Sequence, residues 1–108
     1  MFGFNRPRLN SITASEVEQR LSGANKPLVV DVREQWEYAE GHIPGSKLKP
    51  LNRIQSWAGE LKKDDEIVLV CRSGARSASA YEFLQANGFT NLKNMAGGMI
   101  TWRGAVER

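Results

Sequence analysis

The chain's only cysteine, Cys71, stands among residues that favour its reactive, ionised form. It opens the polar segment Cys71-Arg-Ser-Gly-Ala-Arg-Ser77, which contains two arginines. The thiolate is the nucleophilic form of cysteine, and a free thiol titrates near a pKa of about 8.5. The guanidinium groups of Arg72 and Arg76 favour a nearby negative charge, so we expect a lowered pKa for Cys71. Nucleophilic chemistry at sulfur is therefore predicted, and the alternative is a buried structural cysteine.

The segments on either side of Cys71 place it where ligands bind in open α/β sheets. The preceding apolar run, Ile67–Val70, is typical of a strand buried on both faces. The alanine-rich segment Ser77–Ala86 predicts a helix, with Gly88 as its left-handed C-terminal cap. Between them, Gly74 lets the loop curl so that the N–H groups of residues 72–76 form an anion-binding nest. We expect the helix end and this nest to lower the pKa more than the arginines do.

The rest of the chain alternates short apolar strands with helices. Thr13–Glu16 has the pattern of a capping box before a helix that ends near Gly23, and Leu28–Val32 is a second buried strand. Further strands are expected at 46–48 and 91–93, and further helical segments at 34–40, 51–61 and 98–103. This alternation predicts an α/β fold: one parallel sheet with helices on both faces.

Length and composition predict one small, soluble globular domain. We expect a flexible segment over residues 1–10 and a domain over 11–108. The net charge of +3 is small and dispersed, so no nucleic-acid partner is expected. No apolar run approaches the roughly 20 residues that span a bilayer, and no signal peptide is visible, so no membrane partner is expected. A single cysteine fits a cytoplasmic monomer, although a periplasmic protein whose signal peptide had been removed would look the same.

Three motifs together resemble the rhodanese-homology family. Cys71-x4-Arg76-Ser77 is similar to the family's active-site loop, and the other two motifs are Asp31-Val-Arg-Glu-x-x-Glu-Tyr-x-x-Gly-His-Ile-Pro-Gly45 and Gly97-Gly-x-x-x-Trp102. The resemblance covers nearly the whole chain, from about Ile12 to the C-terminus. The resemblance implies a rhodanese-like sulfurtransferase that takes a sulfane sulfur from a small anionic donor, such as thiosulfate or a persulfide. Cys71 would hold it as a persulfide and pass it to a thiol, cyanide or protein acceptor, with no cofactor.

The expected site has Cys71 as its nucleophile and the rest of the loop as its binding surface. The substrate-binding candidates are Arg72, Ser73, Gly74, Ala75 and Arg76, and the supporting candidates are Asp31, Arg33, His42, Ser77, Gly97 and Gly98. Arg33 and Glu37 lie four residues apart and would face one another on a helix. His42, the only imidazole, is a weaker candidate for a base than for a hydrogen bond to backbone in its turn. One histidine and one cysteine form no metal site of recognisable spacing.

Two other functions remain as alternatives. The first is a non-catalytic interaction or regulatory module of the same fold, which the retained cysteine and arginines disfavour. The second is a cysteine phosphatase or arsenate reductase, whose loops resemble this one but are one residue longer, Cys-x5-Arg. A shorter loop draws its N–H groups into a tighter ring, which suits a terminal sulfur atom better than a tetrahedral oxyanion.

Overall fold

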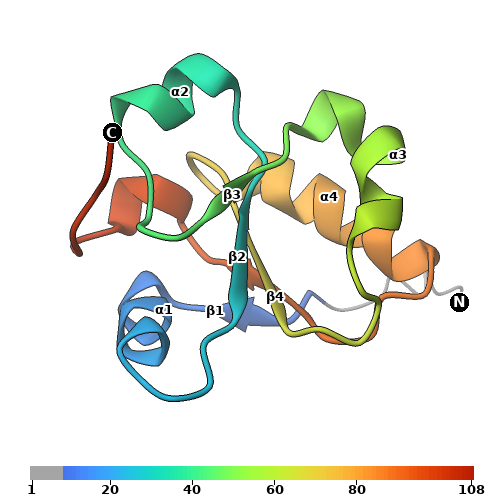
Figure 1. Ribbon diagram of the computed structural model, residues 1–108, viewed down its shortest axis with the longest axis horizontal. Coiled ribbons are helices and arrows are strands. Elements are labelled where there is room, and N and C mark those ends of the chain that lie inside the picture. The colour runs from blue at the N-terminus through green and yellow to red at the C-terminus, as the bar shows by residue number, and fades with distance from the viewer. Residues whose placement is uncertain (1–8) are drawn as a thin grey trace, which may run out of the picture.

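Five parallel strands form the central sheet of the computed structural model, which describes residues 9–108 (Figure 1). The order across the sheet is β1-β5-β4-β2-β3, so β4 lies in the centre between β5 and β2. The strands are β1 Ser11–Ile12, β2 Leu28–Asp31, β3 Lys47–Leu48, β4 Ile67–Val70 and β5 Leu92–Met95. Because all pairs are parallel, the C-terminal ends of the strands meet at one edge. The predicted α/β fold is confirmed.

Helices cover both faces of this sheet. In Figure 1, α1 (Ala14–Leu21) and the red turn η3 (Gly98–Thr101) lie to one side of β2, and α3 (Ile54–Trp57) and α4 (Ala75–Ala86) lie to the other. Two short 3-10 turns, η1 (Leu51–Arg53) and η2 (Ala58–Glu60), flank α3. The short helix α2 (Gln35–Glu40) follows β2 and lies beyond the C-terminal ends of the strands.

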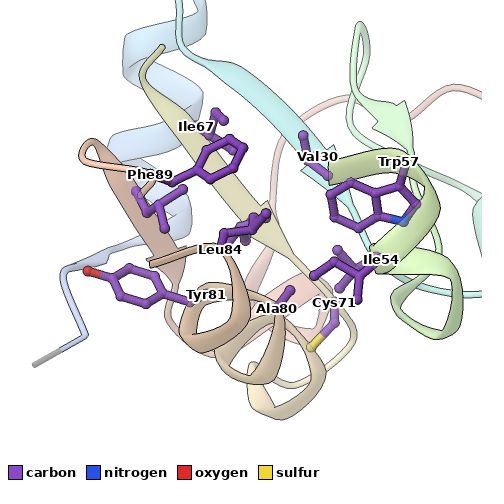
Figure 2. Packing of buried hydrophobic residues seen from close by; sticks show 12 residues of the cluster. Val30, Ile54, Trp57, Ile67, Cys71, Ala80, Tyr81, Leu84 and Phe89 are labelled. Atoms are coloured by element: carbon purple, nitrogen blue, oxygen red, sulfur yellow. The ribbon is translucent and has the colours of Figure 1, made fainter. Parts of the chain in front are cut away.

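The layers create two apolar clusters that share the central strand. Ile67 and Leu69 of β4 pack in the cluster beneath α3 and α4, whereas Val68 and Val70 pack in the cluster beneath α1. This alternation follows the two-residue period of a strand, and all four side chains are buried because both faces are covered. Figure 2 shows the first cluster, where Cys71 and Ala80 lie at one end. Each fully buried Val, Leu or Ile side chain contributes about 1.5–3 kcal/mol.

Local signals define most elements, but several predicted boundaries differ from the structure, and the last predicted helix, 98–103, is a 3-10 turn that ends at Thr101. The capping box at Thr13 is present, with mutual bonds to Glu16, and Gly88 takes the predicted left-handed conformation. Helix α4 begins at Ala75, two residues earlier than predicted, because Gly74 within the loop takes a left-handed φ of 107° and is the N-cap residue of the helix. Strand β5 spans 92–95 rather than 91–93, since pairing with both β1 and β4 sets its register.

The segment predicted to be flexible, residues 1–10, lies outside the described residues up to position 8. Within its described part, the Asn10 carbonyl accepts a hydrogen bond from the Asn94 N–H at 2.7 Å, which extends the β1–β5 pairing. At the other terminus, the backbone of Glu107 pairs with that of His42 through two bonds of 2.9 Å. No helix within residues 9–108 has the length and apolar character needed to cross a membrane.

Candidate active site

The Cys71 loop connects the central strand to α4 and encloses its own sulfur. The Gly74 N–H donates to Cys71 Sγ at 3.0 Å, and the Ser77 hydroxyl donates to the same atom at 3.4 Å. The Ser77 hydroxyl is held in turn near the Gly74 carbonyl at 3.2 Å. Cys71 is 0% exposed, and its side chain lies at the end of the cluster beside α4 (Figure 2). The loop therefore shields the sulfur from water while directing hydrogen-bond donors at it.

These donors decide the ionisation of the thiol. Burial raises the pKa of Cys71, but hydrogen bonds from the Ser77 hydroxyl and from the N–H groups of Ser77, Gly74 and Ser73 outweigh it. The pKa consequently lies below its ordinary value, as predicted. The donors differ in part from the expected set, because Ser77, which begins the predicted helix, supplies two of them. Its hydroxyl can reach Sγ because α4 begins early and turns this side chain toward the loop.

The glycine-rich turn before η3 closes against the loop from the other side. Met99 donates its N–H to the Cys71 carbonyl at 2.9 Å, and Ile100 donates to the Arg72 carbonyl at 3.1 Å. Gly98 has a φ of 59°, and a Cβ at this position would collide with both of those carbonyl groups. The turn thus requires glycine for close backbone approach and fixes the path of the Cys71 loop.

The two arginines of the loop have different surroundings. Arg76 forms a two-pronged salt bridge with Glu37 of α2, at 2.7 and 2.8 Å. Its hydrogen bonds lower the pKa of Glu37 to about 2, despite the opposing effect of burial. The pKa of Arg76 is raised, first by Glu37 and to a lesser degree by the charge of Cys71. By contrast, the exposed Arg72 side chain has no hydrogen-bond or ion-pair partner among residues 9–108.

The Asp31 and His42 region supports the loop between β2 and β3. Arg33 forms a buried ion pair with Asp31, with Nη2–Oδ2 at 2.8 Å, and it also donates to the Gly41 carbonyl. The predicted pairing of Arg33 with Glu37 is wrong, because Arg33 precedes α2 and points back to the strand end. His42 donates from Nδ1 to the Tyr38 carbonyl at 2.8 Å and stacks on the Tyr38 ring. This is the predicted hydrogen bond to backbone, and it occupies Nδ1 of the imidazole ring.

An open cleft of about 510 Å³ lies beside the loop, between α2 and η3. Its walls carry four charged side chains: Arg33 and Glu37 are already paired, whereas Arg72 and Glu40 have no side-chain partner among residues 9–108. The remaining lining residues are Trp36, Gly41, Met99 and Ile100. The cleft therefore combines a guanidinium next to Cys71 and a carboxylate on α2 with several apolar side chains.

Comparison with known proteins identifies the family. A family model described as the rhodanese-like domain matches residues 13–105, which include strands β2 to β5, the Cys71 loop and the glycine turn. The chain belongs to the rhodanese-like family. The three sequence motifs that resemble this family are thus correctly assigned.

Relatives of this rhodanese-like domain carry sulfurtransferase names. A protein of Allochromatium vinosum named sulfurtransferase is 37% identical over 94 residues, which cover 87% of this chain and 88% of that protein. The thiosulfate sulfurtransferase GlpE of Pseudoalteromonas translucida is 33% identical and matches 74% of this chain and 76% of its own length. The crystal structure of a rhodanese-like domain protein from Staphylococcus aureus has a TM-score of 0.85 at 37% identity and covers 92% of this chain and 97% of that one. Family and relatives support a role in sulfur transfer.

The structure brings most of the sequence-predicted residues of the rhodanese-like domain to one sheet edge. Ser73, Gly74 and Ser77 surround the sulfur, and Gly97 and Gly98 form the turn against it. Sequence reasoning missed the contact of Glu37 with Arg76 and the contribution of Trp36 and Ile100 to the cleft. Trp36 and Ile100 are exposed, so they do not belong to the repeating pattern of buried apolar residues from which the elements are predicted. No cluster of three or more His, Cys, Asp or Glu side chains within residues 9–108 is arranged to hold a metal ion.

Proposed function

We propose that this rhodanese-like domain transfers a sulfane sulfur through a persulfide on Cys71. The Cys71 thiolate attacks the outer sulfur of a donor such as thiosulfate. A new S–S bond forms to Sγ, the bond from that sulfur to the sulfite group breaks, and sulfite leaves with the electron pair. An acceptor thiolate or cyanide then attacks the outer sulfur of the persulfide. The electron pair of the broken S–S bond returns to Sγ, and no cofactor takes part.

The observation that carries this proposal is the convergence of N–H and O–H donors on a lone sulfur at a strand end. Donors from Gly74 and Ser77 lie 3.0 and 3.4 Å from Sγ, and they favour the thiolate that both steps require. The same ring of donors is suited to the negative charge on the outer sulfur of a persulfide. Because Cys71 is 0% exposed, loop atoms must shift before a donor reaches Sγ.

Arg72 is proposed as the residue that attracts the anionic donor. It is exposed, lines the cleft and has no partner among the described side chains, whereas Arg76 is held by Glu37. This arrangement also disfavours the phosphatase alternative. Both terminal nitrogens of Arg76 already donate to the Glu37 carboxylate, so Arg76 is not free to bind a tetrahedral phosphate. In addition, the loop has one residue fewer than those phosphatase loops.

The test is intact-mass measurement after incubation with thiosulfate or a low-molecular-weight persulfide. We expect the mass to rise by one sulfur atom and to return when cyanide or a thiol is added. The Cys71→Ser variant should fold normally and take up no sulfur, because the loop is shaped by backbone contacts such as Met99 to Cys71 rather than by the sulfur itself.

Two results would count against this function. If no donor forms an adduct, the interaction module is favoured, since the domain would then bind a partner without using Cys71 as a nucleophile. Hydrolysis of aryl phosphates that exceeds sulfur transfer and disappears in Cys71→Ser would favour the phosphatase.

A further inference from the structure

Two large apolar side chains on either side of the cleft face solvent. Trp36 on α2 is 65% exposed and Ile100 on η3 is 56% exposed, the highest values for large apolar residues among residues 9–108. The other two tryptophans, Trp57 and Trp102, are buried in the two apolar clusters. Exposed apolar residues that gather at one functional site, rimmed by polar groups, mark interaction surfaces.

Short contacts connect the segments that carry Trp36 and Ile100 to the Cys71 loop. The Ile100 N–H is bonded to the Arg72 carbonyl at 3.1 Å. Trp36 directly precedes Glu37, whose carboxylate holds Arg76 at the other end of the loop. A partner that rests on Trp36 and Ile100 is therefore placed at a defined position relative to Cys71.

We propose that Trp36 and Ile100 form a docking surface for a protein acceptor that presents its thiol beside an apolar residue and a carboxylate. This inference rests on the proposed sulfur transfer and names the acceptor class of the same site. The apolar residue of the acceptor packs between Trp36 and Ile100, and its carboxylate faces Arg72. Sulfur then passes from the Cys71 persulfide to the acceptor thiolate, and the electron pair of the broken S–S bond returns to Sγ.

Exposure distinguishes a protein from a small acceptor. A small thiol or cyanide within the cleft leaves most of the Trp36 and Ile100 surface in water, because both side chains line the cleft and are nevertheless more than half exposed. A protein segment lying across the cleft covers both, and tryptophan is among the residues that contribute most at protein interfaces.

Charge complementarity defines the acidic group of the acceptor. Arg33 is neutralised by Asp31 and Glu37 by Arg76, so these lining charges have partners within the domain. Among residues 9–108, the lining charges without a side-chain partner are those of Arg72, adjacent to Cys71, and Glu40, at the end of α2. A carboxylate next to the acceptor thiol therefore finds its partner in Arg72.

The experiment measures discharge of the loaded protein by acceptors that differ in one feature at a time. Cys71 is first loaded with thiosulfate and the adduct is verified by mass. Discharge is then followed with cyanide and with three acetylated, amidated cysteine peptides whose central residues are Leu-Cys-Glu, Leu-Cys-Lys and Ser-Cys-Gln. We expect the Leu-Cys-Glu peptide to exceed Ser-Cys-Gln by about tenfold in kcat/KM, with Leu-Cys-Lys between them.

Variants of the surface identify its contribution. In Trp36→Ser and Ile100→Ser the preference for Leu-Cys-Glu should fall to about threefold or less, while discharge by cyanide stays within about twofold. The matched control is Leu9→Ser, which removes an apolar side chain that is 37% exposed and precedes β1, at the opposite end of the sheet from Cys71. It should keep the full preference. Because all three side chains are exposed, the variants are expected to fold, which thermal melting checks.

The outcomes separate this inference from the function on which it rests. Failure of all donors to load Cys71 would overturn the proposed function and the docking surface with it. Normal loading with equal rates for the three peptides would overturn only the docking surface. An equal loss of cyanide and peptide discharge in Trp36→Ser or Ile100→Ser would also overturn it, because these residues would then shape the loop rather than hold the acceptor.

Discussion

Replacement of Glu37 with glutamine is expected to destabilise the domain, because it removes the charge that holds Arg76. Glutamine preserves the size and shape of the side chain, so the packing of α2 against the Cys71 loop is unchanged. The variant loses the two-pronged salt bridge between α2 and the first turn of α4, at 2.7 and 2.8 Å. The experiment therefore isolates the electrostatic connection between these elements.

The magnitude follows from the pKa of Glu37. A lowering from 4.5 to about 2 corresponds to roughly 3 kcal/mol in favour of the ionised form, at about 1.4 kcal/mol per pKa unit. Glu37 itself is largely buried, but the Arg76 side chain is 36% exposed, so solvent screens part of the interaction. We expect Glu37→Gln to lower the free energy of unfolding by about 2 kcal/mol at neutral pH.

The pH dependence has a defined sign. Because the folded-state pKa of Glu37 is depressed, the contribution is complete above pH 4.5 and is lost as the pH falls through about 2. Urea denaturation at pH 7, 4 and 2 should therefore show a difference between the natural protein and the variant that shrinks toward acid. Glu66, held by Arg20 and Lys93, also has a pKa of about 2, so only this difference isolates Glu37.

A surface ion pair provides the matched control. Glu60 contacts Lys49 at 2.7 Å but is 62% exposed, so Glu60→Gln should change the free energy of unfolding by less than about 0.5 kcal/mol. The reasoning is refuted if Glu37→Gln is as stable as the natural protein at pH 7. A deficit of unchanged size at pH 2 would equally show that its origin is not the charge.

Two further predictions concern the loop and its supporting turn. Ser77→Ala should shift the inflection of Cys71 alkylation to higher pH, because the hydroxyl donor to Sγ is lost, whereas Ser79→Ala, which removes an exposed hydroxyl of the same helix, should not. An unchanged alkylation profile in Ser77→Ala would contradict this. Gly98→Ala should lower the free energy of unfolding by at least about 2 kcal/mol in urea denaturation and slow sulfur transfer, since its left-handed φ and the backbone beside it exclude a Cβ. Gly59→Ala, where nothing lies within 4 Å, should change stability by less than about 0.5 kcal/mol, and equal effects of the two substitutions would contradict the prediction.

Features that depend on neighbouring residues were predictable from the sequence. The run Ile67–Val70 has the composition of a strand covered on both faces, and it occupies the centre of the sheet. The capping box at Thr13 and the left-handed cap at Gly88 follow from local sequence patterns alone. The position of Cys71 between a strand and a helix also follows from local pattern, and β4 and α4 lie on either side of it as predicted.

The partners of the loop residues were not predictable, because they come from distant segments. Arg76 and Glu37 are 39 residues apart, and the arrangement of α2 beyond the strand ends brings them together. For the same reason, the sequence suggested two arginines free for substrate, whereas the structure commits Arg76 to Glu37 and leaves Arg72 unpaired.

The sequence by itself therefore determined the fold class, the place of Cys71 at a strand end and the direction in which the pKa of its thiol moves, because strand burial, helix capping and loop curvature are set over a few consecutive residues. Only the tertiary structure decided which donors reach Sγ, which arginine is free, and that Trp36 and Ile100 share one cleft. The physical reason is the parallel order β5-β4-β2, which brings the segments that follow these strands to one edge of the sheet. Contacts among those segments depend on their distances in space, and these distances cannot be read from the spacing of residues along the chain.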